Sequence, residues 1–249
     1  MRPNLIMILV DDLGWADLSC YGSTFHETPH LDTLARSGTR FTEAYAAAPV
    51  CSPSRASLLT GKWPARVGVT NFIGGHAVGR LADVPYFHEL PQNEYSLARA
   101  LADEGFATWH VGKWHLGERL SSPESHGFEV NIGGCGLGHP PSYFSPYRIP
   151  TLVDGPEGEY LTDRLTEEAA RLITEHDRER PFFLNLWHYT VHIPIQAPEA
   201  LTARYRAKAA RLGLDPEPFV DGEPMPTWHL AGQRVRRRTV QSDPGYAAM

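Results

Sequence analysis

The sequence predicts an α/β protein with a mostly parallel sheet flanked by helices on both faces. Apolar runs without polar alternation, typical of strands covered on both faces, occur at residues 4–10, 106–111 and 181–187. Amphipathic helical patterns lie between these runs, as in successive strand–helix units. The length of 249 residues suits one α/β domain or two small ones.

Composition narrows the class of protein further. A formal net charge of −6 argues against binding to nucleic acid, and the three cysteines, Cys20, Cys51 and Cys135, do not make a disulfide framework. No apolar run approaches the roughly 18 residues of a membrane span. The short run at residues 5–10 lacks the features of a secretory signal. The sequence as given therefore predicts a cytoplasmic protein, or a periplasmic or secreted one if a leader precedes residue 1.

Two adjacent carboxylates, Asp11 and Asp12, follow the first predicted strand. The carboxyl ends of strands in an open α/β sheet form the edge where ligands bind. Adjacent carboxylates there repel each other, and a hard divalent cation relieves the repulsion. The alternative is a solvated turn with one Asp capping a helix.

A short helix is predicted at residues 28–38, with Thr28 as its cap and Gly38 as its end. His30, within it, is interpreted as structural. Residues 39–45 (TRFTEAY) then read as a strand that leads to the next helix.

That next helix places a thiol at its N-terminus. Ser52 is the predicted N-cap, Pro53 the first helical residue and Gly61 the end. Cys51 therefore lies where unpaired N–H groups and the helix dipole favour an anion. Arg55 leans back toward the same end and can bind an oxyanion held near Cys51. The alternative is a capped helix with a buried thiol and a solvated arginine.

Two further strand ends carry polar groups. Residues 112–117 (GKWHLG) follow the strand at 106–111, and an extended backbone points Lys113 and His115 to the same side. A lysine and a histidine at one point suit an anionic leaving group, through charge stabilisation and proton transfer. A core turn flanked by tryptophans is the alternative. His188 and His192 follow the strand at 181–187 in the same way.

The other segments carry less chemistry. Residues 67–90 are irregular and rich in glycine, histidine and aromatic residues, so we expect them to line the substrate pocket, with His76 and His88 as surface histidines. The glycine-rich loop at 133–138 is no dinucleotide fingerprint, because no helical pattern follows it. The remaining predictions are helices at 96–105, 161–175 and 201–212, and a solvated basic loop at 234–238.

Two of these segments carry a family resemblance. Residues 51–62 (CSPSRASLLTGK) and 112–117 resemble the signatures of type I sulfatases, the formylglycine-dependent arylsulfatases of the alkaline-phosphatase-like superfamily. The resemblance implies that Cys51 is converted to formylglycine, whose hydrate is the nucleophile. It also implies a Ca²⁺ site, or one for another divalent cation such as Mg²⁺, with Asp11, Asp12 and residue 51 as ligands.

The same resemblance assigns roles to the other polar residues. Arg55, Lys113 and His192 are expected to bind sulfate oxygens, and His115 to lie near the nucleophile or the leaving group. The predicted function is a sulfuric ester hydrolase acting on a small-molecule or saccharide sulfate, with a formylglycine-generating maturation enzyme as partner. An alternative is a phosphonate or phosphate monoester hydrolase of the same superfamily.

The chain also departs from the family pattern. After a segment like residues 245–249, family members continue to an Asp-Asn pair that completes the metal site, and then to a smaller C-terminal subdomain. Residues 1–249 are therefore interpreted as the N-terminal catalytic α/β domain, truncated before these parts. We expect an exposed apolar sheet edge, weak metal binding and little activity for this chain alone. The alternative function is a non-catalytic sulfatase-like fragment.

Overall fold

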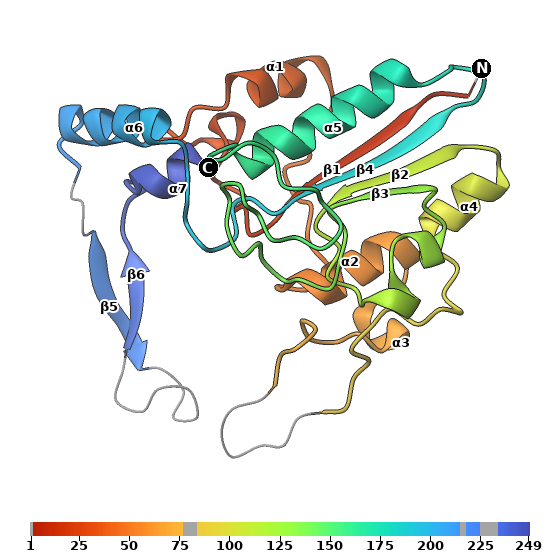
Figure 1. The fold of residues 1–249 in the computed structure, drawn as a ribbon. Helices are drawn as coiled ribbons and strands as arrows, with labels where there is room; N and C mark the ends of the chain where they lie inside the picture. The colour runs from red at the N-terminus through yellow and green to blue at the C-terminus, as the bar shows by residue number, and fades with distance from the viewer. Residues whose placement is uncertain (1, 77–83, 215–217, 225–233) are drawn as a thin grey trace. The chain divides into compact units, whose positions relative to one another are not determined.

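The computed structural model describes residues 2–76, 84–214, 218–224 and 234–249 (Figure 1). It confirms the predicted α/β class with a parallel sheet. No helix in these ranges is long and apolar enough to cross a membrane. The chain divides into two compact units: unit 1 is Met1–Asp12, Tyr45–Gly75 and Tyr86–Gln196, and unit 2 is Leu13–Ala44, His76–Pro85 and Ala197–Met249.

A four-stranded sheet in the order β1-β4-β2-β3 forms the centre of unit 1. Each pair is parallel, and the register places Leu5 opposite Phe183 and Ala107 opposite Phe182. Parallel strands bring their carboxyl ends to one edge, so the polar residues after β1, β2 and β4 meet there. The strands are β1 (Leu5–Val10), β2 (Ala107–Gly112), β3 (Val130–Ile132) and β4 (Phe182–His188).

Helices cover both faces of this sheet. Phe183 and Trp187 of β4 pack with Ala56, Leu59 and Ala98 in one buried cluster on the side of α2 and α4. The helix α5 packs on β4 and β2 from the other side (Figure 1). The helices of unit 1 are α2 (Cys51–Thr60), α3 (Pro64–Val67), α4 (Leu97–Asp103), α5 (Leu161–Glu175) and the 3₁₀ helices η2 (Arg119–Ser121) and η3 (Glu124–His126).

Strand β1 is an apolar edge of the sheet. Within the described residues of the sheet it pairs with β4 alone. Met7 and Leu9 point into the cluster with α2 and α4, whereas Ile6 and Ile8 on the alternate face are 51% and 55% exposed. The sequence predicts an exposed apolar edge and also a strand at residues 4–10 that is covered on both faces. The second prediction is wrong for β1, because one of its faces is exposed. An uncovered edge strand of this kind favours self-association.

The start of α2 differs from its prediction. The helix begins at Cys51, and Ser52 is not its cap. The Ser52 hydroxyl instead donates to the carbonyl of His115 at 2.9 Å and accepts from the N–H of Ile73 at 3.0 Å. Ser52 thus ties the helix start to two loops. The predicted end at Gly61 is confirmed. Gly61 has a left-handed backbone conformation, and its N–H donates to the carbonyl of Ser57 in the last turn.

Two other predictions from the sequence are wrong. Residues 39–45 form no strand and their side chains are exposed, because no described segment pairs with them. The predicted loop at residues 234–238 is instead an exposed strand, paired antiparallel with β5. The elements of unit 2 are η1 (Ser19–Tyr21), α1 (Pro29–Ser37), α6 (Glu199–Arg211), β5 (Phe219–Pro224), β6 (Arg234–Arg238) and α7 (Pro244–Ala248).

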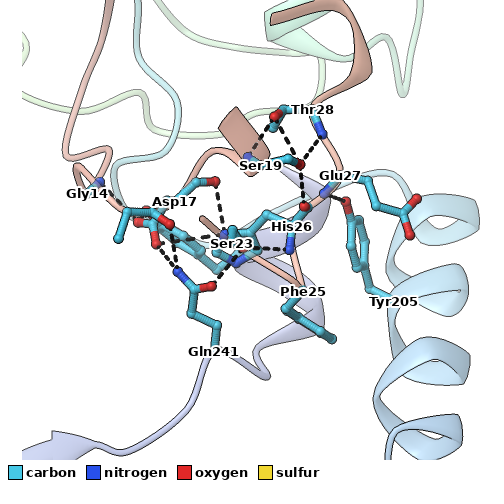
Figure 2. A network of polar contacts seen from close by, with 12 residues as sticks. Gly14, Asp17, Ser19, Ser23, Phe25, His26, Glu27, Thr28, Tyr205 and Gln241 are labelled. Carbon is cyan, nitrogen blue, oxygen red and sulfur yellow. Dashed lines mark hydrogen bonds and ion pairs between the residues drawn. The ribbon is translucent and has the colours of Figure 1, made fainter. Parts of the chain in front are cut away.

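A polar network joins the early and late segments of unit 2 (Figure 2). The Asp17 carboxylate accepts hydrogen bonds from the N–H of Gly14 at 3.0 Å, from Gln241 at 2.7 Å and from Tyr246 at 2.6 Å. His26 is buried beside it, with Nδ1 at 3.0 Å from the Asp17 carbonyl. Burial lowers the pKa of His26, and Asp17 partly opposes this. The network thus joins residues that lie more than 220 positions apart in the sequence, such as Asp17 and Tyr246.

Candidate active site

The most buried charges of unit 1 converge on Asp11, the first residue after β1. Its carboxylate accepts from Arg55 Nη2 at 3.0 Å through Oδ1 and from Lys113 Nζ through Oδ2. The side chains of Asp11, Arg55 and Lys113 are only 6%, 1% and 0% exposed. Two cations therefore share one carboxylate. The buried group carries a surplus positive charge, which favours a further anion nearby.

Three contacts hold the guanidinium of Arg55, although its buried Nε has no hydrogen-bond partner among the described residues. It reaches Asp11 from the first turns of α2, and its Nη1 donates to the carbonyl of Lys113 at 2.9 Å. The guanidinium also lies 4.8 Å from the ring centroid of Trp187, in a cation–π contact. The sequence predicts Arg55 at an oxyanion near Cys51, and the structure places it on Asp11.

The charges of this group change one another's pKa. Burial raises the pKa of Asp11, but the neighbouring charges of Arg55 and Lys113 outweigh it and hold that pKa below its usual value. Burial, followed by the charge of Arg55, lowers the pKa of Lys113, and Asp11 opposes both. Asp11 is therefore ionised at neutral pH.

Cys51 faces a histidine whose protonation can be inferred from its contacts. The Sγ of Cys51 is 3.1 Å from Nδ1 of His115, and Nε2 of His115 is 3.1 Å from the carbonyl of Ile73. A carbonyl only accepts, so Nε2 carries the hydrogen and Nδ1 offers a lone pair to residue 51. Burial, with the charge of Lys113, lowers the pKa of His115 to about 4. His115 is thus neutral at pH 7 and can accept a proton from a group at position 51.

Glycine is required where the loop after β3 packs against this histidine. A Cβ added to Gly138 would lie 2.7 Å from Cε1 of His115, closer than real Cβ contacts allow. Both His115 and Asp12 adopt left-handed backbone conformations, with φ of 53° and 59°. Such conformations are uncommon for residues other than glycine and occur often at functional sites. The backbone thus fixes the direction of both side chains.

A candidate cation site lies beside this group. Ligand atoms of Asp11, Asp12 and His192 are all within 4.8 Å of one another, the one such group among the described residues. Backbone bonds between Asp11 and residues 190–191, at 2.8 and 2.7 Å, hold the segment before His192 there. Carboxylate oxygens suit Ca²⁺ or Mg²⁺, so the donors fit a divalent cation but supply only part of the roughly six to eight ligands that Ca²⁺ takes.

Two roles that the resemblance assigns, Cys51 as a metal ligand and His192 as a sulfate ligand, are not tested by this geometry. The Sγ of Cys51 is not a member of the three-residue group, and its role as a metal ligand stays a prediction. His192, which the resemblance assigns to sulfate, has Nε2 at 3.6 Å from Oδ2 of Asp12. It therefore lies beside the candidate cation site, and its sulfate contact also stays a prediction.

One cavity of about 550 Å³ joins the reactive groups. Cys51, His115, Asp12 and His192 line it, whereas Arg55 and Lys113 are buried and do not. Its other lining residues are Pro49, Val50, Phe72, Ile73, Gly74, Gly136, Leu137, Gly138 and His139. A second cavity, of about 620 Å³, lies at the amino ends of β1 and β4 and contains none of the predicted site residues.

The residues that line this cavity were only partly predicted from the sequence. Residues 72–74 of the segment 67–90, which is expected to line the substrate pocket, line this cavity, while residues 77–83 lie outside the described chain. His88 is exposed, contacts the ring of Tyr86 in a tilted arrangement and does not line the cavity. Gly138 and His139 were missed, because a glycine-rich loop has no periodicity that shows which residue faces a cavity.

Comparison with known proteins decides the family. The sulfatase family model matches residues 3–238 of this chain. The chain belongs to the sulfatase family. It is 37% identical over 220 residues to rat N-acetylgalactosamine-6-sulfatase, covering 78% of this chain and 40% of that relative. It is 33% identical over 248 residues to mouse arylsulfatase G, covering 86% of this chain and 46% of the relative. The chain thus spans under half the length of these sulfatases.

Solved structures share the fold. The structure of Ps i-CgsB in complex with k-i-k-neocarrahexaose is 31% identical, with a TM-score of 0.68 over 82% of this chain and 48% of that one. The putative sulfatase yidJ of Bacteroides fragilis, 24% identical, has a TM-score of 0.68 over 99% of this chain and 55% of that one. These likenesses confirm the predicted sulfatase-type, alkaline-phosphatase-like sheet with flanking helices.

Proposed function

We propose that this chain carries the nucleophile and sulfate-binding groups of a sulfate ester hydrolase, with a formylglycine made from Cys51 as the nucleophile. The observation that carries the proposal is the buried group of Arg55, Asp11 and Lys113, which has a surplus positive charge and includes Arg55 of α2, the helix that begins at Cys51. A sulfate monoanion offsets such a charge. Membership of the sulfatase family supports the same reaction.

Each residue then has a role set by its contacts. Arg55 and Lys113 provide positive charge toward the sulfate, and His192 reaches the cavity from the wall beside Asp12. The Nδ1 lone pair of His115 takes a proton from a hydroxyl at position 51, or returns one to the departing alcohol. A hydrated formylglycine would present two such hydroxyls where the thiol now lies. A divalent cation at Asp11 and Asp12 would supply further positive charge to the sulfate and the nucleophile.

The substrate we propose is a sulfated saccharide. The rat relative is an N-acetylgalactosamine-6-sulfatase, and Ps i-CgsB is described in complex with k-i-k-neocarrahexaose. The cavity of about 550 Å³ lies within the usual size range of small-molecule sites. Its wall combines histidines with the ring of Phe72. Both features suit a sugar ring with polar substituents and apolar C–H faces.

Conversion of Cys51 is the first test of the proposal. Residues 1–249, expressed in a host that matures a known sulfatase, should yield the aldehyde form of the Cys51 peptide in mass spectrometry. Cys135, outside the sulfatase signature, provides the internal control and should remain a thiol. An unmodified thiol in every Cys51 peptide, from a host whose other sulfatase is converted, would contradict the proposed nucleophile.

Metal binding by residues 1–249 alone is expected to be weak. Asp11, Asp12 and His192 leave several positions of a Ca²⁺ shell to water, so we expect affinity in the range of about 10⁻⁴–10⁻³ M rather than micromolar. Little turnover of an aryl sulfate should accompany it. Isothermal titration calorimetry measures the affinity, with Asp12→Asn as a control that should remove the remaining heat. Micromolar binding with clear turnover would show that these residues are sufficient.

A further inference from the structure

His139 lies at the outer wall of the cavity that contains Cys51. The cavity has a closed and an open end, because His115 is 4% exposed beside Cys51 whereas His139 and Phe72 on the wall are exposed. An ester whose sulfur approaches residue 51 must place its sulfate at the closed end. Its alcohol part then extends along the wall that includes His139 and Phe72.

The contacts of His139 leave one ring nitrogen available. Its ring stacks on that of His192, with centroids 5.9 Å apart and planes inclined by 14°. Its Nδ1 is 3.3 Å from the carbonyl of Pro140, which only accepts, so Nδ1 carries the hydrogen. Nε2 then has a lone pair and no partner among the described residues. It can accept a hydrogen bond from a ligand hydroxyl or amide N–H.

The loop that carries His139 is held in place by its neighbours. Gly138 packs directly on the ring of His115, and Pro140 is buried. His139 is therefore fixed between two anchored positions, with its ring supported by His192. A side chain held in this way loses little conformational freedom when it binds a ligand, which favours a role in recognition.

We propose that His139 is a specificity-determining residue that recognises the alcohol part of the ester: its Nε2 accepts a hydrogen bond from a hydroxyl or amide N–H of the sulfated sugar. The proposal rests on the proposed function and deepens it. It separates the cavity into a sulfate end at Cys51 and His115, and a sugar end at His139 and Phe72.

The test compares two ligands, inorganic sulfate and N-acetylgalactosamine 6-sulfate, by NMR titration of residues 1–249. His139→Ala should weaken binding of the sugar sulfate about 5- to 10-fold, the loss expected for one hydrogen bond, and leave the affinity for inorganic sulfate within about twofold. His139→Gln retains an acceptor and should recover most of the affinity. His139→Phe retains the stacked ring alone and should behave like His139→Ala. The matched control, His88→Gln, changes another exposed histidine of unit 1 that contacts an aromatic ring, and it should alter neither affinity.

Each other outcome contradicts a stated claim. Equal weakening of both ligands by His139→Ala, with recovery in His139→Phe, would make His139 a support for His192 and overturn the proposal. Unchanged affinity for the sugar sulfate in all three variants would also overturn the proposal. In that case, binding of both ligands by the wild-type chain would leave the proposed function intact. A chain that binds neither ligand would overturn both.

Discussion

Replacing Asp11 by asparagine should lower the free energy of unfolding of residues 1–249 by about 3–5 kcal/mol, the loss expected when a buried ion pair loses one partner. The change leaves Arg55 and Lys113, both almost fully buried, without their shared carboxylate. An amide oxygen can accept from one of them, but its NH₂ group then faces the other cation. Urea unfolding in the presence of a chelator measures the loss apart from any effect of metal binding.

The neighbouring carboxylate provides the matched control. Asp12 has a side chain that is 57% exposed and lies 3.6 Å from His192, with no buried cation against it. Asp12→Asn should therefore change the free energy of unfolding by less than about 1 kcal/mol. If the two variants lost the same stability, the buried group at Asp11 would not be the anchor of this edge of the sheet.

Gly112→Ala should unfold the chain or lower its free energy of unfolding by more than about 4 kcal/mol, among the largest effects of single substitutions. Gly112 ends β2 with φ of 102°, and an added Cβ would lie 2.0 Å from the carbonyl oxygen of Trp187. That oxygen already accepts a hydrogen bond from the N–H of Lys113 at 2.7 Å. Strands β2 and β4 therefore cannot move apart without losing this bond. Thermal and urea unfolding measure the change.

Gly105→Ala separates backbone strain from collision. Gly105 also has a left-handed φ, 83°, but nothing lies within 4 Å of its added Cβ. This control should lose only the left-handed penalty, about 1–2 kcal/mol. A similar loss in both variants would mean that β2 and β4 separate at little cost, contrary to the close approach described above.

The sequence predicted the features that arise from local pattern. Helix α5 has the bounds expected from its periodicity, and the apolar runs form β1, β2 and β4, of which β2 and β4 are buried throughout. The Asp pair, Lys113 and His192 follow those strands at one edge, because parallel strands place their carboxyl ends together. Their position could therefore be inferred before any contact was known.

Features that depend on tertiary contacts could not be predicted in this way. Ser52 has a good capping side chain, but its hydroxyl bonds the backbone of two distant loops instead. The arginine-rich strand β6 exists through pairing with β5, and residues 39–45 lack such a partner. His139 lies in a loop whose path is set by packing of Gly138 on His115, a contact without any local signal.

The confinement of Arg55 has a thermodynamic consequence. A free arginine side chain loses about 1.5–2 kcal/mol of rotamer entropy when it is fixed. The guanidinium is already held by Asp11, the Lys113 carbonyl and the Trp187 ring. This entropy is therefore lost when the chain folds and not when a substrate binds. In the proposed sulfate transfer, the charge of Arg55 needs no reorganisation as negative charge shifts. The arginine would thus act as a fixed electrostatic environment, whose contribution to the barrier does not depend on motion of its own.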